Sequence, residues 1–210
     1  MFVLLFFGIV GFAIGRVITL CISSFFHQRN YLNEACANTM IILGSGGHTT
    51  EMLEIVKKLN KDRYVPRFYV VSEGDQNSVD KLLSIENDRD DYKIYVITRS
   101  RKVHQSYFSS IFTTLKSFID CIPLLHHSRP NLILCNGPGI CVPVCIVAYL
   151  LKVFYINTAC RIVFIESYCR VKTLSLSGWI LLYLTDLFIV QWPELAKKVS
   201  RKVMYFGRLT

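Results

Sequence analysis

The chain has 210 residues, which is enough for one α/β domain with a sizeable core and too few for two complete ones. Hydrophobic residues make up 52% and charged residues 19%, which is too apolar for an ordinary soluble domain and too interrupted for a protein with many membrane spans. The net charge of +9 indicates an anionic partner, which could be phosphate, a membrane surface or nucleic acid. The eight cysteines form no C-x-x-C pair, so we expect buried, reduced thiols and neither a disulfide framework nor a metal site.

Residues 1–26 form an apolar run that is interrupted only by Arg16. As a helix, the run is long enough to span a bilayer core of about 30 Å. A cleaved signal peptide would need a basic region before the run, and none is present, so we favour a retained transmembrane anchor. Arg16 either snorkels, pairs within the membrane, or shifts the span towards Phe2–Gly15. Because His27 and Arg29 follow the run, the positive-inside rule predicts a lumenal N-terminus and a cytosolic domain.

After a polar linker at residues 27–39, strands and helices alternate through residues 40–210. The expected strands are residues 40–43, 67–71, 92–98, 131–135, 162–166, 187–191 and 202–207. The expected helices are residues 50–59, 78–83, 106–125, 140–151 and 174–184. Nearly continuous apolar strands that alternate with helices indicate a parallel sheet covered on both faces. The predicted fold class is therefore α/β, a Rossmann-like doubly wound parallel sheet, with ligands at the carboxyl ends of its strands.

The segment 106–125 is amphipathic, because apolar residues recur at helical spacing on one face and polar residues occupy the other. Pro123 is expected to end this helix a residue or two early. One interpretation is a helix that covers the sheet. The other is a helix that rests on a membrane surface, supported by the basic residues just before it. These membrane or anion contacts would be Arg99, Arg101 and Lys102.

A glycine turn, Gly44–Gly47, connects the first strand of the domain to its first helix. Such a turn brings backbone N–H groups and the positive end of a helix to one point, which is a natural anion site. A P-loop would need a lysine that this turn lacks. A dinucleotide fingerprint would need a third glycine where Thr49 stands, although Glu73 does occupy the place of a ribose-binding acid. A membrane-tethered NAD(P) oxidoreductase therefore remains the alternative function.

A second glycine turn, Asn136–Gly139, also follows a strand, so its amides should converge on the same edge of the sheet. Two anion-binding turns at one edge suit a diphosphate. His48 stands at a helix start beside the expected anion, where it is a candidate ligand or acid/base. Glu166 ends another strand at this edge, where a helix N-terminus holds it or it acts on substrate hydroxyls.

Several strings occur in one order over the stretch from Met40 to the C-terminus: "GSGGHTTEML", "TRSRKVHQS", "LCNGPGICVP", "IVFIESYCRVKTLSLSG", "DLFIVQWPEL" and "YFGRL". Together they resemble the family of membrane-anchoring subunits of the eukaryotic UDP-N-acetylglucosamine transferase. The resemblance implies the acceptor-side, N-terminal half of a GT-B glycosyltransferase, inactive alone, with a separate soluble subunit that binds UDP-GlcNAc. It also implies transfer of GlcNAc to GlcNAc-diphosphodolichol at the cytosolic face of the endoplasmic reticulum, the second step of lipid-linked oligosaccharide synthesis for N-glycosylation, with no cofactor, no metal and no nucleic acid.

The resemblance also implies roles for residues that match the family's motifs. His48 and Glu166 become the candidate catalytic residues, with His48 the first candidate for the general base. The expected contacts to the acceptor diphosphate are Gly44, Ser45, Gly46, Gly47, Thr49, Asn136, Gly137, Pro138, Gly139 and Arg170.

Overall fold

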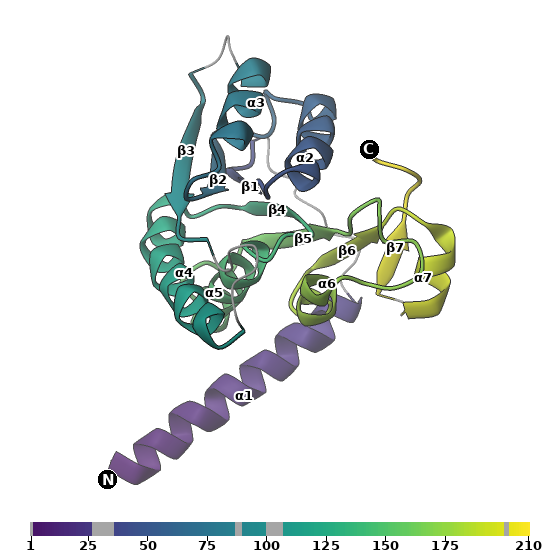
Figure 1. Cartoon of the computed structure of the whole chain (residues 1–210). Coiled ribbons are helices and arrows are strands. Elements are labelled where there is room, and N and C mark those ends of the chain that lie inside the picture. Colours follow the sequence, from purple (N-terminus) through teal and green to yellow (C-terminus); the bar gives the residue numbers. More distant parts are fainter. Residues whose placement is uncertain (1, 27–35, 87–89, 100–106, 200–201) are drawn as a thin grey trace.

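The computed structural model describes residues 2–26, 36–86, 90–99, 107–199 and 202–210 (Figure 1). Its strands are β1 (Thr39–Ile42), β2 (Arg67–Ser72), β3 (Tyr92–Ile97), β4 (Leu132–Asn136), β5 (Arg161–Ile165), β6 (Leu187–Val190) and β7 (Val203–Tyr205). Its helices are α1 (Phe2–Phe26), α2 (Gly47–Lys58), α3 (Gln76–Glu86), α4 (Tyr107–Ser128), α5 (Cys141–Val153), α6 (Leu176–Leu181) and α7 (Pro193–Val199).

The strands of the described chain form one parallel sheet in the order β3-β2-β1-β4-β5-β6-β7. The order runs outward from β1 on one side and from β4 on the other, so the chain reverses direction between these two central strands. Doubly wound sheets bind ligands in the crevice at this switch point, beyond the carboxyl ends of the strands. The predicted Rossmann-like parallel sheet is therefore confirmed, and the two glycine turns follow the two strands at its switch point.

Helices cover both faces of the sheet, with α2 and α3 on one face and α4 and α5 on the other (Figure 1). The larger core lies under α4 and α5, where fully buried side chains such as Ile133 and Val144 meet. The smaller core lies under α2 and α3 and includes Met52, Val56 and Leu82, none of which is exposed. Burial on both faces explains why the central strands are nearly continuous apolar runs.

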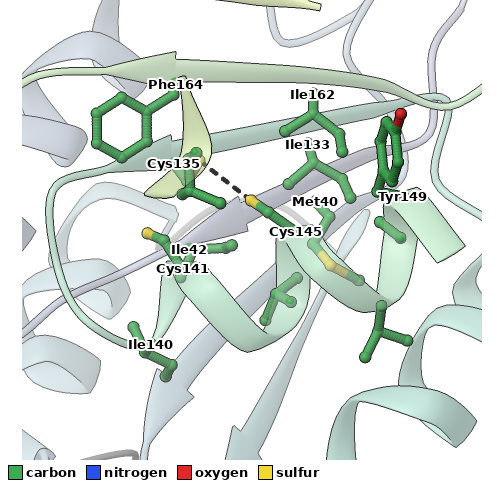
Figure 2. Close-up of a cluster of buried hydrophobic side chains, with 14 of the residues drawn as sticks. Met40, Ile42, Ile133, Cys135, Ile140, Cys141, Cys145, Tyr149, Ile162 and Phe164 are labelled. Atoms are coloured by element: carbon green, nitrogen blue, oxygen red, sulfur yellow. Dashed lines mark hydrogen bonds between the residues drawn. The ribbon is translucent and has the colours of Figure 1, made fainter. Parts of the chain in front are cut away.

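Cysteines contribute to the larger core at the junction of β4 and α5 (Figure 2). The Sγ atoms of Cys135 and Cys145 lie 3.5 Å apart in van der Waals and weak hydrogen-bond contact, without a covalent bond. Burial raises the pKa of the Cys160 thiol to about 12, and the pKa of Cys121 rises to about 12 for the same reason. For the cysteines whose side chains are described, the prediction of reduced thiols is confirmed, and all except Cys36 and Cys169 are buried.

Two elements differ from the sequence prediction. Helix α4 does not end near Pro123 but continues to Ser128. The last turn is held because Leu124 and Leu125 are buried in the core and the Ser128 hydroxyl donates to the carbonyl of Leu124 at 2.7 Å. The short helix α7 was not predicted, although Pro193 at its first position is a usual start signal.

The N-terminal apolar run is one helix, α1, as predicted. Among the residues that the structure describes, no helix is both long enough and apolar enough to cross a membrane. The guanidinium of Arg16 lies 4.1 Å from the ring centroid of Tyr155, in the loop after α5, and the hydroxyl of Tyr149 donates to the carbonyl of Val17 at 3.3 Å. Arg16 is therefore paired with an aromatic ring of the domain, an arrangement that the sequence alternatives did not include.

A buried ion cluster closes the amino end of the sheet, away from the glycine turns. The side chain of Arg67, only 1% exposed, donates to the carboxylate of Glu86 at 3.0 and 3.1 Å and also to Asp91. Lys61 pairs with the same Glu86 carboxylate at 3.2 Å. Each charge in this cluster has a partner, which is what makes its burial tolerable.

Replacing Arg67 with methionine should destabilise the domain by roughly 3–5 kcal/mol, because removing one member of a buried pair leaves an uncompensated charge. Urea denaturation followed by circular dichroism measures the loss. The matched control is Lys57→Met, which breaks the exposed pair with Glu54 at 2.6 Å and should change the midpoint little. Equal losses for both variants would contradict the importance of the cluster.

The same cluster gives a dependence on pH. Burial acts to raise the pKa of Glu86, but hydrogen bonds from Tyr69 and Arg67 outweigh it and hold the pKa below its ordinary value of 4.5. A carboxyl whose folded pKa is lowered contributes stability above its ordinary pKa and loses it as the pH falls through the folded value. The unmodified chain should therefore lose more stability than Arg67→Met when acidified below 4.5.

Candidate active site

A polar cavity of about 290 Å³ opens at the switch point of the sheet. Its lining comes from the start of α2, the turn after β4, and the segment from β5 to α6. The lining residues are Gly47, His48, Glu51, Gly137, Glu166, Ser167, Cys169, Arg170 and Ser175. The structure thus brings together five of the predicted residues, Gly47, His48, Gly137, Glu166 and Arg170, from three separate parts of the chain.

The two glycine turns touch each other directly. A Cβ atom added at Gly44 would lie 2.5 Å from Cγ of Pro138, which no folded structure tolerates. A Cβ atom at Gly137, where φ is +61°, would lie 2.7 Å from Cε1 of His48. Glycine is required at both positions by this close approach, and at Gly137 also by the left-handed backbone.

The start of α2 has the properties of an anion site. The helix begins at Gly47, three residues earlier than predicted, so His48 lies within its first turn. Gly46 precedes the helix with φ +66°, and no side chain caps its first amides. Uncapped N–H groups and the positive end of a helix dipole favour a negative charge at this point.

His48 is half-buried beside the cavity, and its Nδ1 atom lies 3.0 Å from Oδ1 of Asn136. Asn136 is the last residue of β4 and is fully buried, so it holds the imidazole from beneath the cavity. Its amide nitrogen donates to Glu51 at 2.9 Å. The imidazole is therefore fixed at Nδ1, and its Nε2 atom is the one available for chemistry.

Glu166 is completely buried, and its carboxylate already accepts three hydrogen bonds. The backbone N–H and hydroxyl of Ser175 donate to Oε2 at 2.9 and 3.0 Å, and the N–H of Ser167 donates to Oε1 at 3.1 Å. Burial raises the pKa of Glu166 above its ordinary value, although these donors and the charge of Arg170 act in the opposite direction. Of the two alternatives left by the sequence, the one in which a helix N-terminus holds Glu166 matches this geometry, because Ser175 is the N-cap of α6.

The remaining predicted residues lie around the cavity. Ser45, Gly46 and Arg99 line a second polar cavity of about 500 Å³ on the far side of the first glycine turn. Gly44 and Thr49 are buried, and the Thr49 hydroxyl lies 2.6 Å from that of Ser78. Pro138 is half-buried against Gly44, and Gly139 is exposed. Arg101, Lys102 and linker residues 27–35 lie outside the described residues.

Some cavity residues were missed by the sequence prediction, namely Glu51, Ser167, Cys169 and Ser175. Glu51 carried a usable signal, since it follows His48 by three residues and so shares its face of α2. For the residues after β5, the signal was their position at the carboxyl end of a strand. Within the described part of the chain, no group of three or more metal-ligating side chains is placed to hold a metal ion.

A doubly wound sheet with two anion-binding turns at its switch point, one contributing a histidine, defines a domain of the GT-B type. The solved structure of MurG from Acinetobacter baumannii has the same fold, with a TM-score of 0.60 over 80% of this chain at 14% identity. This chain covers 44% of that MurG chain, so it spans under half of its length.

The chain belongs to the Alg14 family. The family model described as "Oligosaccharide biosynthesis protein Alg14 like" matches residues 39–209. The UDP-N-acetylglucosamine transferase subunit ALG14 of Homo sapiens is 48% identical over 179 residues, which cover 81% of this chain and 82% of the human protein. The subunit of the same name from Yarrowia lipolytica is 46% identical over 166 residues, covering 77% and 76% respectively. The recognition made from the sequence strings is thereby confirmed.

The alternative of an NAD(P) oxidoreductase gains no support. Thr49, at the place of the third glycine in a dinucleotide fingerprint, is fully buried against Ser78, so a side chain fills the space that a glycine would leave. Glu73, the candidate ribose-binding acid, is exposed.

Proposed function

We propose that the chain is the membrane-bound, acceptor-binding subunit of a heteromeric transferase that moves GlcNAc from UDP-GlcNAc to GlcNAc-diphosphodolichol. The observation that carries the proposal is His48 beside two touching glycine turns, on a chain whose 48% identical relative is named a UDP-N-acetylglucosamine transferase subunit. The nucleotide sugar is then supplied by a separate soluble subunit. The span of under half of the MurG chain supports this division of the enzyme.

The cavity divides the chemistry among its residues. The diphosphate of the acceptor lies against the uncapped start of α2 and the second glycine turn, with the exposed charge of Arg170 nearby. Nε2 of His48 accepts the proton of the acceptor hydroxyl as its oxygen bonds to the anomeric carbon of GlcNAc and UDP leaves. Glu166 holds the segment after β5 in place, because its oxygens are occupied by backbone and serine donors.

The split-enzyme proposal is tested by reconstitution in microsomal membranes. The chain together with its soluble partner should transfer labelled GlcNAc to the lipid acceptor, and each component alone should be inactive. Transfer by the isolated chain in detergent would overturn the division of labour. Affinity capture from membranes should also recover a soluble protein that binds UDP-GlcNAc.

Cys169 offers a direct probe of the acceptor position, because it is an exposed thiol in the lining of the cavity. Acceptor at about ten times its Kd should slow alkylation of Cys169 by N-ethylmaleimide about tenfold, since only the unoccupied site reacts. Mass spectrometry of tryptic peptides measures the rate. The internal control is Cys36, also exposed but absent from this lining, whose rate should not change. Unaltered labelling of Cys169 would place the acceptor elsewhere.

The proposed localisation is the endoplasmic reticulum membrane, with residues 1–26 as a single anchor, the N-terminus in the lumen and the domain in the cytosol. The support is the apolar run with Arg16 paired to the domain, and the basic residues that follow the run. Glycosylation acceptor sequences on polar extensions test this orientation. The extension before residue 1 should be glycosylated and one after residue 210 should not; the reverse pattern would refute it.

A second contact with the membrane is proposed on the face of the domain that carries α4 and α6. These helices and α1 lie on the same side of the sheet (Figure 1). Large exposed apolar side chains on α4 are Ile111, Phe112, Leu115, Ile119 and Ile122. Those on and beside α6 are Leu176, Trp179, Ile180 and Tyr183. Tryptophan and tyrosine among aliphatic side chains suit the interfacial zone of a bilayer.

The two tryptophans of the chain test this contact. Trp179 is 53% exposed on α6, whereas Trp192 donates its ring N–H to the carbonyl of Tyr168 at 2.7 Å near the cavity. In vesicles of lipids with brominated acyl chains, the Trp192→Phe variant should lose fluorescence through Trp179. The matched Trp179→Phe variant, which reports only Trp192, should keep its fluorescence. Equal responses would contradict a membrane contact at α6.

A further inference from the structure

The carboxylate of Glu51 joins three segments of the active site. Glu51 lies in the second turn of α2 and lines the cavity. Its Oε2 accepts hydrogen bonds from Nδ2 of Asn136 at 2.9 Å and from the N–H of Tyr168 at 3.3 Å. Its Oε1 accepts from the hydroxyl of Ser167 at 2.8 Å. The side chain therefore links α2 to the ends of β4 and β5.

These contacts fix which way the amide of Asn136 points. An ionised carboxylate can only accept hydrogen bonds, so the NH₂ group of Asn136 must face Glu51. Its Oδ1 atom then faces Nδ1 of His48, 3.0 Å away. The opposite orientation would set the amide oxygen against the carboxylate and lose a hydrogen bond in a site that is fully buried at Asn136.

The amide orientation in turn fixes the tautomer of His48. Because Oδ1 of Asn136 can only accept, Nδ1 of the imidazole must carry the proton. Nε2 is then left with its lone pair, which is the form that a general base requires. The ring cannot easily rotate away, since the Gly137 backbone lies close enough that a Cβ there would be 3.0 Å from Nδ1.

We infer that Glu51 is a positioning residue that acts through Asn136 to hold His48 in its Nδ1-protonated, base-competent tautomer. The inference deepens the proposed function and rests on His48 being the base of that reaction. Glu51 itself makes no contact that the chemistry requires. Its contribution is the direction of one amide group and, through it, the location of one proton.

The first test measures the tautomer without any activity. In ¹⁵N-histidine spectra of the full chain, the His48 signals, identified by their loss in His48→Ala, should report the Nδ1–H form. Glu51→Gln replaces one carboxylate oxygen with a donor, so Asn136 can turn over and present its NH₂ group to His48. The variant should show a large fraction of the Nε2–H form. An unchanged tautomer would overturn the inference, whatever the reaction proves to be.

The second test is a double-mutant cycle in the reconstituted complex. Glu51→Gln should lower kcat by up to about 10²-fold with little change in the KM for the acceptor, as expected for a misplaced catalytic group. If Glu51 acts through His48, the double variant with His48→Ala should be no slower than His48→Ala alone. Multiplied losses would show an independent structural role. Glu51→Asp keeps an acceptor-only side chain and should recover part of the rate.

Discussion

Replacing His48 with alanine is expected to lower the kcat of the reconstituted transferase by about 10²–10⁴-fold, the usual contribution of a positioned general base. The imidazole is the one cavity side chain that is both half-buried and able to exchange a proton at neutral pH. Glu166, the other candidate, has its carboxylate occupied by donors from Ser167 and Ser175. The rate is measured as labelled GlcNAc transferred at saturating acceptor and UDP-GlcNAc.

The control for this loss is another histidine of the same chain. His126→Ala removes an exposed imidazole on α4, outside the lining of the active-site cavity, and should leave the rate close to that of the unmodified chain. Binding of the soluble partner should be unaffected in both variants, because neither substitution leaves a buried group unpaired at a distance from the cavity. A His48→Ala complex that retains full kcat would remove His48 as the base and transfer the question to groups on the partner.

Replacing Gly137 with alanine is expected to cost about 10²-fold in kcat, the effect of moving a catalytic group by roughly 1 Å. The added Cβ would lie 2.7 Å from Cε1 and 3.0 Å from Nδ1 of His48, so the ring must shift away from Asn136. The φ of +61° at Gly137 adds strain for any residue with a side chain. Steady-state kinetics of the reconstituted complex measure the loss.

The comparison variant is Gly139→Ala in the same turn, where an added Cβ meets no atom within 4 Å. It changes the backbone entropy of the turn in the same way but does not press on the imidazole. Its loss in kcat should be clearly smaller than that of Gly137→Ala. Equal losses would mean that flexibility of the turn, and not the position of the ring, limits the reaction.

The sequence predicted the sheet because its information is local. Apolar strands that alternate with helices determine a doubly wound fold, and glycines after the two central strands mark its switch point. The orientation of Glu166 and the contact between Asn136 and Glu51 depend on segments far apart in the chain, so spacing alone could not reveal them. Pro123 misled the prediction because tertiary burial of the last turn of α4 outweighs the local cost of proline.

The direct contact between the two glycine turns makes their sequences genetically dependent on each other. A side chain at position 44 cannot be accepted while the Pro138 ring occupies the same space, with a separation of 2.5 Å from an added Cβ. Removing that ring with Pro138→Gly should make Gly44→Ala less harmful than it is alone, up to the residual contact of 2.9 Å with Cβ of His48. Such sign-dependent effects, or epistasis, mean that variants in one turn can be judged only together with the residues present in the other.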